Sequence, residues 1–373
     1  MKRLDKFERI QLKRVHQLMP LRSKRRQARD EKSKRRQKRL LVDPHAQYFG
    51  NRQFSSKKII LPKTLSLATS ADRNLLVDRL ASLRSYVLAD NISSVTIDFS
   101  QVEKLHPCGT ILLVAEIERL LEDARYGVKL KATYPEFEVV EQLFQYIRIL
   151  EKLGCPPRME IIDNQDVVVW LYESGVEGNL DAIVNNLPAL LTSGSNMELR
   201  MAVNSGMAEA VANSSEHAYI FERPDGLNVV SPTKWWLFAR KEGDDISLVI
   251  CDLGVGIPGS LPRTWTEDVE AFAKTMIGKK REDHQLIKFA MKLGRSRTNL
   301  THRGQGLKDI LKVVKTQKVG RLGIFSNCGV YNFDGPTGYT FGCSEPTSIL
   351  GTVVQWRVPV AAFNLAVQEG IDE

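Results

Sequence analysis

The sequence predicts an α/β protein made of two domains that follow a basic N-terminal arm. Three observations support this fold class. Strand-like and helix-like segments alternate over residues 58–155, a hairpin and further helices follow in residues 156–365, and basic residues concentrate in residues 1–57. A chain of 373 residues is long enough to bury two hydrophobic cores. We therefore expect an arm and two domains with these boundaries.

The basic charge of the chain lies in the arm, which we expect to be partly disordered, or helical when bound. Residues 1–58 hold 20 Lys or Arg against five Asp or Glu, whereas the rest holds 33 against 39. Residues 22–39 contain 11 basic residues and no aromatic one. Nucleic acid, contacted without base specificity, fits such a run, as do an acidic protein face and anionic lipid. A solvated or partner-binding tail fits it equally well.

Several protein classes find no support in the composition. No apolar run approaches the ~18 residues that span a bilayer, and the N-terminus lacks the apolar core of a secretory signal. The five cysteines are scattered without CxxC spacing, which favours reduced thiols over a zinc site. We therefore expect a cytoplasmic protein without a membrane span.

The first domain is predicted from a β-α-β-α-β-α order. Its apolar residues recur at helical spacing in residues 71–88, where Ser70 is the expected N-cap. Such an alternation is typical of a small α/β layer fold. The expected strands are residues 59–62, 95–99 and 128–133, and the expected helices are residues 71–88, 110–122 and 135–153.

This order resembles the STAS domain of anti-sigma factor antagonists. The resemblance rests on Ile97-Asp98-Phe99-Ser100 and on a helix that opens at His106-Pro107-Cys108-Gly109. In signalling members of that family, a hydroxyl in this turn accepts phosphate. Here Cys108 replaces it, and Thr110 stands one residue past Gly109. We therefore expect a docking or structural role for the turn rather than regulatory phosphorylation.

The second domain carries a polar stripe on a predicted helix, residues 197–219, which follows a strand at 167–172 and a helix at 179–191. Ser205, Glu209, Asn213 and His217 recur every four residues and share one helix face. An amide oxygen suits Mg²⁺, and a carboxylate can orient or deprotonate a water or hydroxyl. A solvated helix face would show the same stripe.

A hairpin at residues 235–239 and 246–251 leads directly into Asp252-Leu253-Gly254-Val255-Gly256. A carboxylate at the end of a buried strand can accept a hydrogen bond from the adenine amino group. The glycines allow the backbone to approach a flat base closely. A capped strand-to-loop turn is the alternative explanation.

Two motifs complete the second domain. Arg303-Gly304-Gln305-Gly306 opens a helix over residues 307–315, and the free N–H groups of a helix start can bind phosphate. Plain helix capping also uses Gly-x-Gly. The last predicted strand, residues 351–359, starts with Gly351-Thr352.

The four motifs, in this order, resemble the N, G1, G2 and terminal boxes of the GHKL superfamily of ATPases and kinases, whose fold is the Bergerat α/β sandwich. The segment Glu209–Tyr219 is most similar to anti-sigma factor serine kinases. The resemblance implies ATP and Mg²⁺ as cofactors and a lid over residues 263–303 that closes over nucleotide. It also implies these roles: Asn213 binds Mg²⁺, Glu209 is the general base, Asp252 holds adenine, Gly254 and Gly256 line the base, Gly304 and Gly306 bind phosphate, Arg303 (or Arg295 or Arg297) stabilises the γ-phosphate, and Thr352 closes the adenine end.

Two functions stay open at this point. The first is an enzyme, a Mg²⁺-dependent ATPase or Ser/Thr protein kinase that uses Glu209 as base. The second is a non-catalytic module in which ATP sets the surface shown to a partner, tethered to nucleic acid by residues 22–39. A histidine kinase is disfavoured, because none of the histidines stands on a dimerisation helix before the ATP-binding domain. A protein partner is expected in both cases, and a homodimer remains open.

Overall fold

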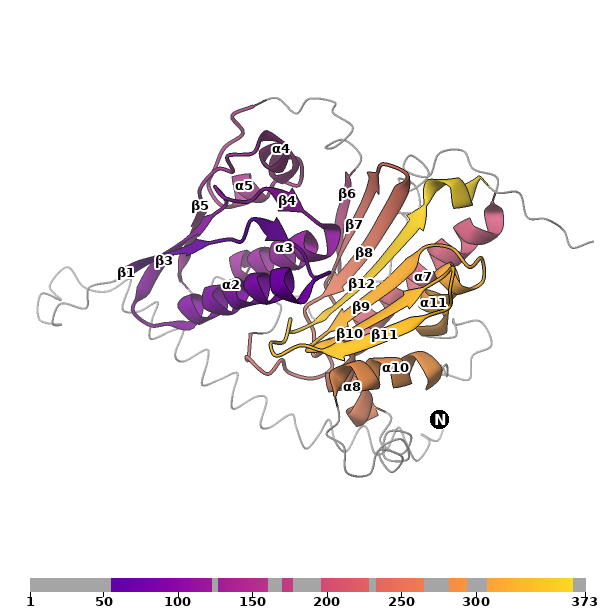
Figure 1. Ribbon diagram of the computed structural model, residues 1–373. Helices are drawn as coiled ribbons and strands as arrows, with labels where there is room; N and C mark the ends of the chain where they lie inside the picture. Colours follow the sequence, from indigo (N-terminus) through magenta and orange to yellow (C-terminus); the bar gives the residue numbers. More distant parts are fainter. Residues whose placement is uncertain are drawn as a thin grey trace, which may run out of the picture.

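The computed structural model describes residues 55–122, 127–159, 170–176, 196–227, 233–264, 282–293 and 307–364. These residues form a mixed α/β structure, in which a parallel β-α-β region is followed by a seven-stranded antiparallel sheet with helices (Figure 1). The basic run at residues 22–39 and the predicted helix at 179–191 lie outside the described residues. None of the described helices is long and apolar enough to cross a membrane.

The first domain has the predicted alternation of strands and helices. Its sheet has the order β1-β3-β5, all parallel, and a two-stranded pair, β2 with β4, lies beside it. The elements are β1 (Ser55–Ile60), β2 (Thr64–Leu65), α2 (Ser70–Leu88), β3 (Ile92–Asp98), β4 (Lys104–Leu105), α3 (Pro107–Glu122), β5 (Lys129–Ala132), α4 (Glu138–Tyr146) and α5 (Ile149–Lys152).

Two local predictions were wrong. Thr69, not Ser70, caps α2, because its Oγ1 accepts a hydrogen bond from the Asp72 amide at 3.2 Å. The predicted helix over residues 135–153 is split into α4 and α5, because Arg148 adopts a left-handed φ of 60° that interrupts the helical path.

The second domain contains the seven-stranded sheet, in the order β11-β10-β9-β12-β8-β7-β6. The predicted hairpin is β7 paired with β8. The lid range contains one described helix of its own, α10. The elements are β6 (Trp170–Gly175), α7 (Met197–His217), β7 (Trp235–Glu242), β8 (Asp245–Asp252), α8 (Gly256–Thr264), α10 (Asp283–Leu293), α11 (Leu307–Lys315), β9 (Arg321–Ser326), β10 (Gly329–Asp334), β11 (Thr340–Ser344), β12 (Thr352–Pro359) and a 3₁₀ turn, Val360–Phe363.

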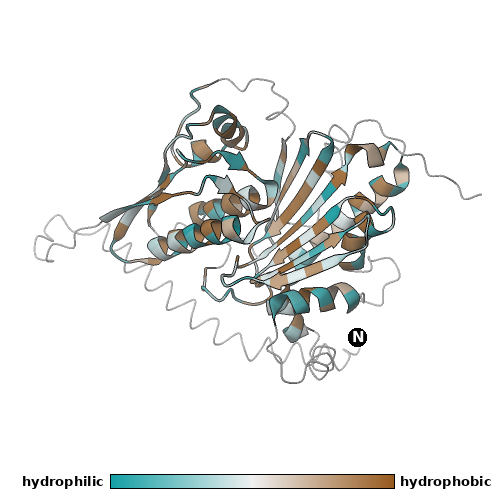
Figure 2. Ribbon diagram, in the orientation of Figure 1, coloured by the Kyte–Doolittle hydropathy of each residue, from teal (hydrophilic) through white to brown (hydrophobic). Residues whose placement is uncertain are grey.

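Helix α3 joins the two domains, because it lies between the two sheets (Figure 1). It contacts β7, β8 and β12 on one side, and nearly all of its residues are buried. One face of the antiparallel sheet therefore belongs to the core of the first domain, with Trp236, Phe238 and Phe325 in that cluster. The opposite face packs against α7, α10 and α11. Figure 2 shows hydrophobic residues along these strands and through α3, as expected for elements covered on both sides.

Candidate functional site

Three polar side chains form a row at one end of the antiparallel sheet. Asp252 ends β8, Thr352 begins β12, and Ser326 ends β9; the register pairs Thr352 with both of the others. All three are buried. Because side chains alternate along strands, they share the sheet face on which Ile250, Val354 and other residues pack against α7 and α11. The Ser326 and Thr352 hydroxyls lie 2.9 Å apart.

The carboxyl group of Asp252 is buried without a counter-charge. Burial raises the pKa of Asp252 to about 7, although hydrogen bonds from Gly254 and Thr352 and the charge of Arg223 act against this shift. The Gly254 amide donates to Asp252 Oδ1 at 2.9 Å. Within the described parts of the chain, no Lys, Arg or His side chain forms an ion pair with it. Such a strongly perturbed acid is typical of functional sites.

The loop after Asp252 docks onto the end of α7. The Val255 amide donates to the Ala218 carbonyl at 2.8 Å. A Cβ at Gly254 would lie 2.1 Å from that carbonyl oxygen, so only glycine fits there. Gly256 has a φ of 72°, and a Cβ there would lie 2.7 Å from the Asn327 side chain. Close packing alone therefore requires glycine at both positions, independently of the predicted role of lining a base.

Glu209 and Asn213 lie one turn apart on α7, as predicted, and contact each other. Asn213 Nδ2 donates to Glu209 Oε1 at 3.0 Å. Burial raises the pKa of Glu209, the Asn213 hydrogen bond opposes the shift, and the charge of Asp309 adds to it. Both side chains are half-buried. A carboxylate with a raised pKa is suited to accept a proton near neutral pH.

The start of α11 lies beside this pair. A Cβ at Gly206 of α7 would lie 2.7 Å from Val313 and 3.3 Å from the Asp309 carbonyl oxygen, so the two helices are in close contact. Arg303, Gly304 and Gly306 directly precede α11 but lie outside the described residues, as does most of the predicted lid.

The described residues contain no group of three or more His, Cys, Asp or Glu able to hold a metal ion by themselves. The predicted Mg²⁺ ligand is a single amide oxygen, and Mg²⁺ commonly takes one or two protein ligands and completes its shell with waters and substrate phosphates. Because Asn213 Nδ2 donates to Glu209, its Oδ1 points away from that carboxylate. The donor set therefore fits Mg²⁺ held together with a nucleotide.

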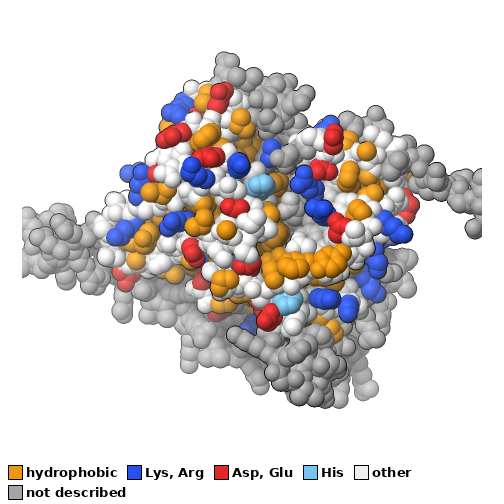
Figure 3. Space-filling view, in the orientation of Figure 1, with side chains coloured by type: hydrophobic (Ala, Val, Ile, Leu, Met, Phe, Trp, Pro, Cys, Tyr) orange, Lys and Arg blue, Asp and Glu red, His pale blue; other side chains and the backbone are white. Residues whose placement is uncertain are grey.

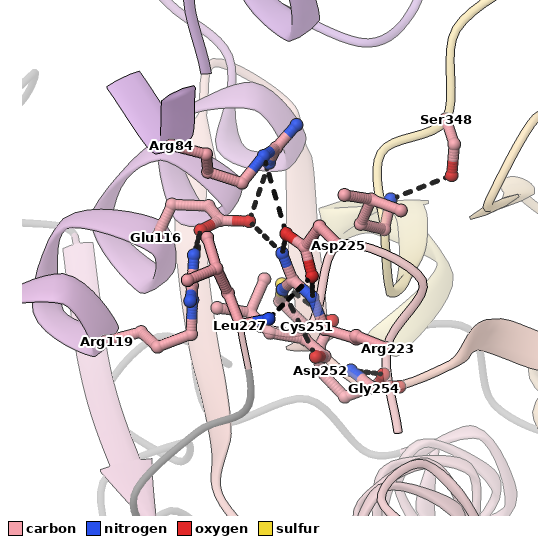
Figure 4. A network of polar contacts seen from close by, with 12 residues as sticks. Arg84, Glu116, Arg119, Arg223, Asp225, Leu227, Cys251, Asp252, Gly254 and Ser348 are labelled. Atoms are coloured by element: carbon pink, nitrogen blue, oxygen red, sulfur yellow. Dashed lines mark hydrogen bonds and ion pairs between the residues drawn. The ribbon is translucent and has the colours of Figure 1, made fainter. Parts of the chain in front are cut away.

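A buried ionic network connects the first domain to this end of the sheet (Figure 4). Glu116 of α3 accepts from Arg84 of α2 at 2.8 Å, from Arg223 at 3.1 Å and from Arg119. Arg223 also donates to the Leu253 carbonyl at 3.3 Å and to Asp225. Leu253 follows Asp252 directly. The network therefore reaches from the first domain to the residue beside the buried carboxyl.

Sequence reasoning missed the partners of this network and also Ser326. Arg223 lies in a short turn with no periodic pattern, and Glu116 appears in the sequence as an ordinary helix residue. Ser326 stands at the end of a strand without a motif. Their only signal is spatial, because they come from elements that are far apart in the sequence.

The turn of the first domain that resembles a phosphorylation site is buried. Cys108 accepts a hydrogen bond from the Leu67 amide at 3.4 Å, and burial raises the pKa of its thiol to about 11. A Cβ at Gly109 would lie 2.4 Å from the Leu65 backbone. Thr110 is fully buried. The turn therefore packs against β2.

Comparison with known proteins gave no match, either to a protein-family model or to a curated protein.

Proposed function

We propose that residues 196–364 form a GHKL-type Mg-ATP site with the Bergerat fold and that the STAS-like first domain is bound to its opposite sheet face. The chain would act as a regulatory protein in which ATP changes the state of the site, with slow hydrolysis or transfer of the γ-phosphate to a Ser or Thr of a protein partner.

The observation that carries this proposal is the buried Asp252 carboxyl without a counter-charge, beside two buried hydroxyls. A buried acid is costly unless a hydrogen-bond donor satisfies it. Gly254 and Thr352 already donate to this carboxyl, and an adenine amino group would supply a further donor, since a carboxylate has about four acceptor sites. Thr352 and Ser326 would supply polar contacts to the base or to a bridging water. This arrangement fits recognition of a flat, amino-bearing ring.

The distances along α7 fit a nucleotide that runs beside the helix. A helix rises 1.5 Å per residue, so Asn213 lies about 7 Å and Glu209 about 13 Å along the axis from Ala218, which contacts the loop after Asp252. A base at Asp252 would therefore direct its phosphates along α7 toward Asn213, Glu209 and the start of α11.

The residues of the chain would divide the chemistry as follows. Glu209, with its raised pKa, would accept a proton from the attacking water or hydroxyl. Asn213 would orient Glu209 through its amide N–H and hold Mg²⁺ through its oxygen. A bound Mg²⁺ ion would neutralise part of the negative charge of the phosphates. Arg303, Gly304 and Gly306 would contact the phosphates from the loop before α11.

The interdomain network supports the regulatory part of the proposal. Arg223 binds the Leu253 carbonyl next to the base site and Glu116 of the first domain at once. A movement of the loop around Asp252 would therefore change the contact of Arg223 with Glu116 of α3. This contact also suits the second candidate, a non-catalytic ATP-gated module, because it needs no turnover.

Calorimetry on the full chain tests the proposal. We expect Mg²⁺-dependent binding of ATP that Asp252→Ala abolishes, because the contact to the base is lost. Asp244→Ala, an exposed acid in the β7–β8 turn, is the matched control and should bind as the wild type does. Absent ATP binding, or equal binding by Asp252→Ala, would reject the site.

The basic arm is tested separately. Deletion of residues 1–40 should remove binding to DNA or RNA while ATP binding persists, because residues 22–39 hold the basic run. Undiminished nucleic-acid binding by the truncated chain would reject the tether.

A further inference from the structure

A cavity of about 590 Å³ lies between α10, α11 and the edge of the antiparallel sheet. Its floor contains the buried side chains of Met291, Tyr331 and Phe333. Its walls carry five lysines and one carboxylate, Asp309. The lysines are Lys288 and Lys292 of α10 and Lys308, Lys312 and Lys315 of α11.

Some of the lysines oppose helix stability, whereas Lys292, Lys312 and Lys315 lie in the last turns of their helices, where the dipole favours a cation. Lys288 and Lys292 are four residues apart, as are Lys308 and Lys312, and like charges at this spacing destabilise a helix. Lys308 also lies in the first turn of α11, where the helix dipole disfavours a cation. Among the described residues none of the five lysines forms an ion pair. Helix stability therefore does not explain Lys308 or the two like-charged pairs.

The charge is exposed at the surface while the floor is apolar. All five lysines are exposed, and Figure 3 shows Lys and Arg side chains gathered over the region of α10 and α11. The volume falls within the roughly 300–1,000 Å³ typical of small-ligand pockets. Cations around a recess with low-dielectric walls concentrate anions there.

The cavity is separate from the site at Asp252. Phe333 pairs with Leu322 of β9, four residues along that strand from Ser326, which corresponds to about 13 Å, and Tyr331 pairs with Ile324, two residues or about 7 Å from Ser326. Helix α11 contacts α7 on one side and α10 on the other, and the cavity lies on the side of α10. A nucleotide along α7 would therefore approach only the first turn of α11, with Lys308 and Asp309, whereas Lys312 and Lys315 lie in its last turn.

We propose that this cavity is a binding site for a small polyphosphate anion, distinct from the ATP site. Lysine ammonium groups are flexible point charges that suit several phosphate groups at once, whereas planar carboxylates are better matched by arginine. The single acid, Asp309, leaves the cavity with a large excess of positive charge. The ligand is a compact molecule with two or more phosphates, because the recess is closed by an apolar floor and too small for a nucleic-acid duplex.

Titration calorimetry of the full chain with inorganic tripolyphosphate, without Mg²⁺, tests the site. The double variant Lys312→Gln/Lys315→Gln should bind about tenfold more weakly, because two charge-assisted contacts are lost. Lys129→Gln/Lys131→Gln, on the exposed edge strand of the first domain, removes the same net charge and should bind as the wild type does. Thermal unfolding midpoints of the wild type and the two double variants show whether each variant remains folded.

The outcomes separate this site from the ATP site. The Lys312→Gln/Lys315→Gln variant, in the last turn of α11, should keep its Mg-ATP affinity, and Asp252→Ala should keep its tripolyphosphate affinity. An equal loss of tripolyphosphate affinity in both double variants would mean that binding depends only on the overall charge of the protein, and it would overturn the proposal. Loss of ATP together with tripolyphosphate in the first variant would also overturn it, because the lysines would then belong to the nucleotide site. If the lysine variant of α11 instead loses affinity only for a single-stranded 20-nucleotide probe, the lysines bind nucleic acid and the polyphosphate proposal is overturned.

Discussion

Glu116 of α3 and Arg223, which follows α7, form a buried ion pair with an N–O distance of 3.1 Å. Their side chains are 1% and 2% exposed. Arg84 and Arg119 contact the same carboxylate, and the three positive charges outweigh the effect of burial, so the pKa of Glu116 lies far below its usual value. Asp252 is equally buried but has no such partners among the described residues, and its pKa rises instead. The contrast separates a structural acid from a candidate binding acid.

We expect Glu116→Gln to lower the free energy of unfolding by about 3–5 kcal/mol, because it leaves buried guanidinium groups without their counter-charge. Urea denaturation at pH 7 measures the loss. Glu151→Gln, which breaks an exposed pair with Arg148, is the control and should change little. Because the folded pKa of Glu116 is lowered, its contribution is present above the unfolded value of 4.5 and disappears as the pH falls below it. An equal effect of both variants would contradict this role.

We expect Asp252→Asn to change the pH dependence of stability. The folded pKa is about 7 and the unfolded one 3.8, so between these values the native state holds a proton that the unfolded state has lost. As the pH rises from 4 toward 7, this group should therefore lower the free energy of unfolding of the wild type by about 1.4 kcal/mol per pH unit. The Asp252→Asn variant should lack this pH-dependent decrease. Urea denaturation at pH 5 and pH 7 provides the difference, with Asp244→Asn as control. Parallel pH profiles of Asp252→Asn and the wild type would show that the carboxyl is not protonated.

We expect Glu209→Gln to bind ATP with little change and to lose turnover by about 10²–10⁴-fold, because the proton acceptor is removed. Labelled γ-phosphate shows whether the label stays on ATP, becomes free phosphate or moves to a protein. The rate of the wild type should fall as the pH drops below the raised pKa of Glu209. Glu136→Gln, an exposed acid of the first domain, is the control. Unchanged turnover in Glu209→Gln would assign the base elsewhere, and no turnover in the wild type would favour the ATP-gated module.

We expect Gly254→Ala to lower the free energy of unfolding by about 1–3 kcal/mol and to weaken ATP binding. The new Cβ would meet the Ala218 carbonyl and push the loop after Asp252 away from α7. Gly243→Ala is the control, because nothing lies within 4 Å of its Cβ, although its φ of 57° makes alanine somewhat strained. Calorimetry should show normal ATP affinity for Gly243→Ala. Equal affinities for the two variants would mean that this contact does not position the site.

Local patterns in the sequence were sufficient to predict most helices and strands of both domains. Helical spacing placed α2, α7 and α11 correctly, because these helices bury a regular stripe of side chains. The hairpin of β7 and β8 followed from two apolar runs around a turn. The pair Glu209 and Asn213 was predictable for the same reason, since four residues make about one helical turn.

The relation between the domains required the three-dimensional structure. Its contacts join residues far apart in the chain, such as Glu116 with Arg223 and Glu118 with Trp236, and no local period encodes such pairs. The pKa values of Asp252 and Glu116 moved in opposite directions for the same reason, because the sequence shows two acids and only the fold determines which one is surrounded by arginines. The sequence by itself established the elements and the acids that are candidates for chemistry. Contacts between residues far apart in the chain determined the surroundings of these acids and therefore their charge.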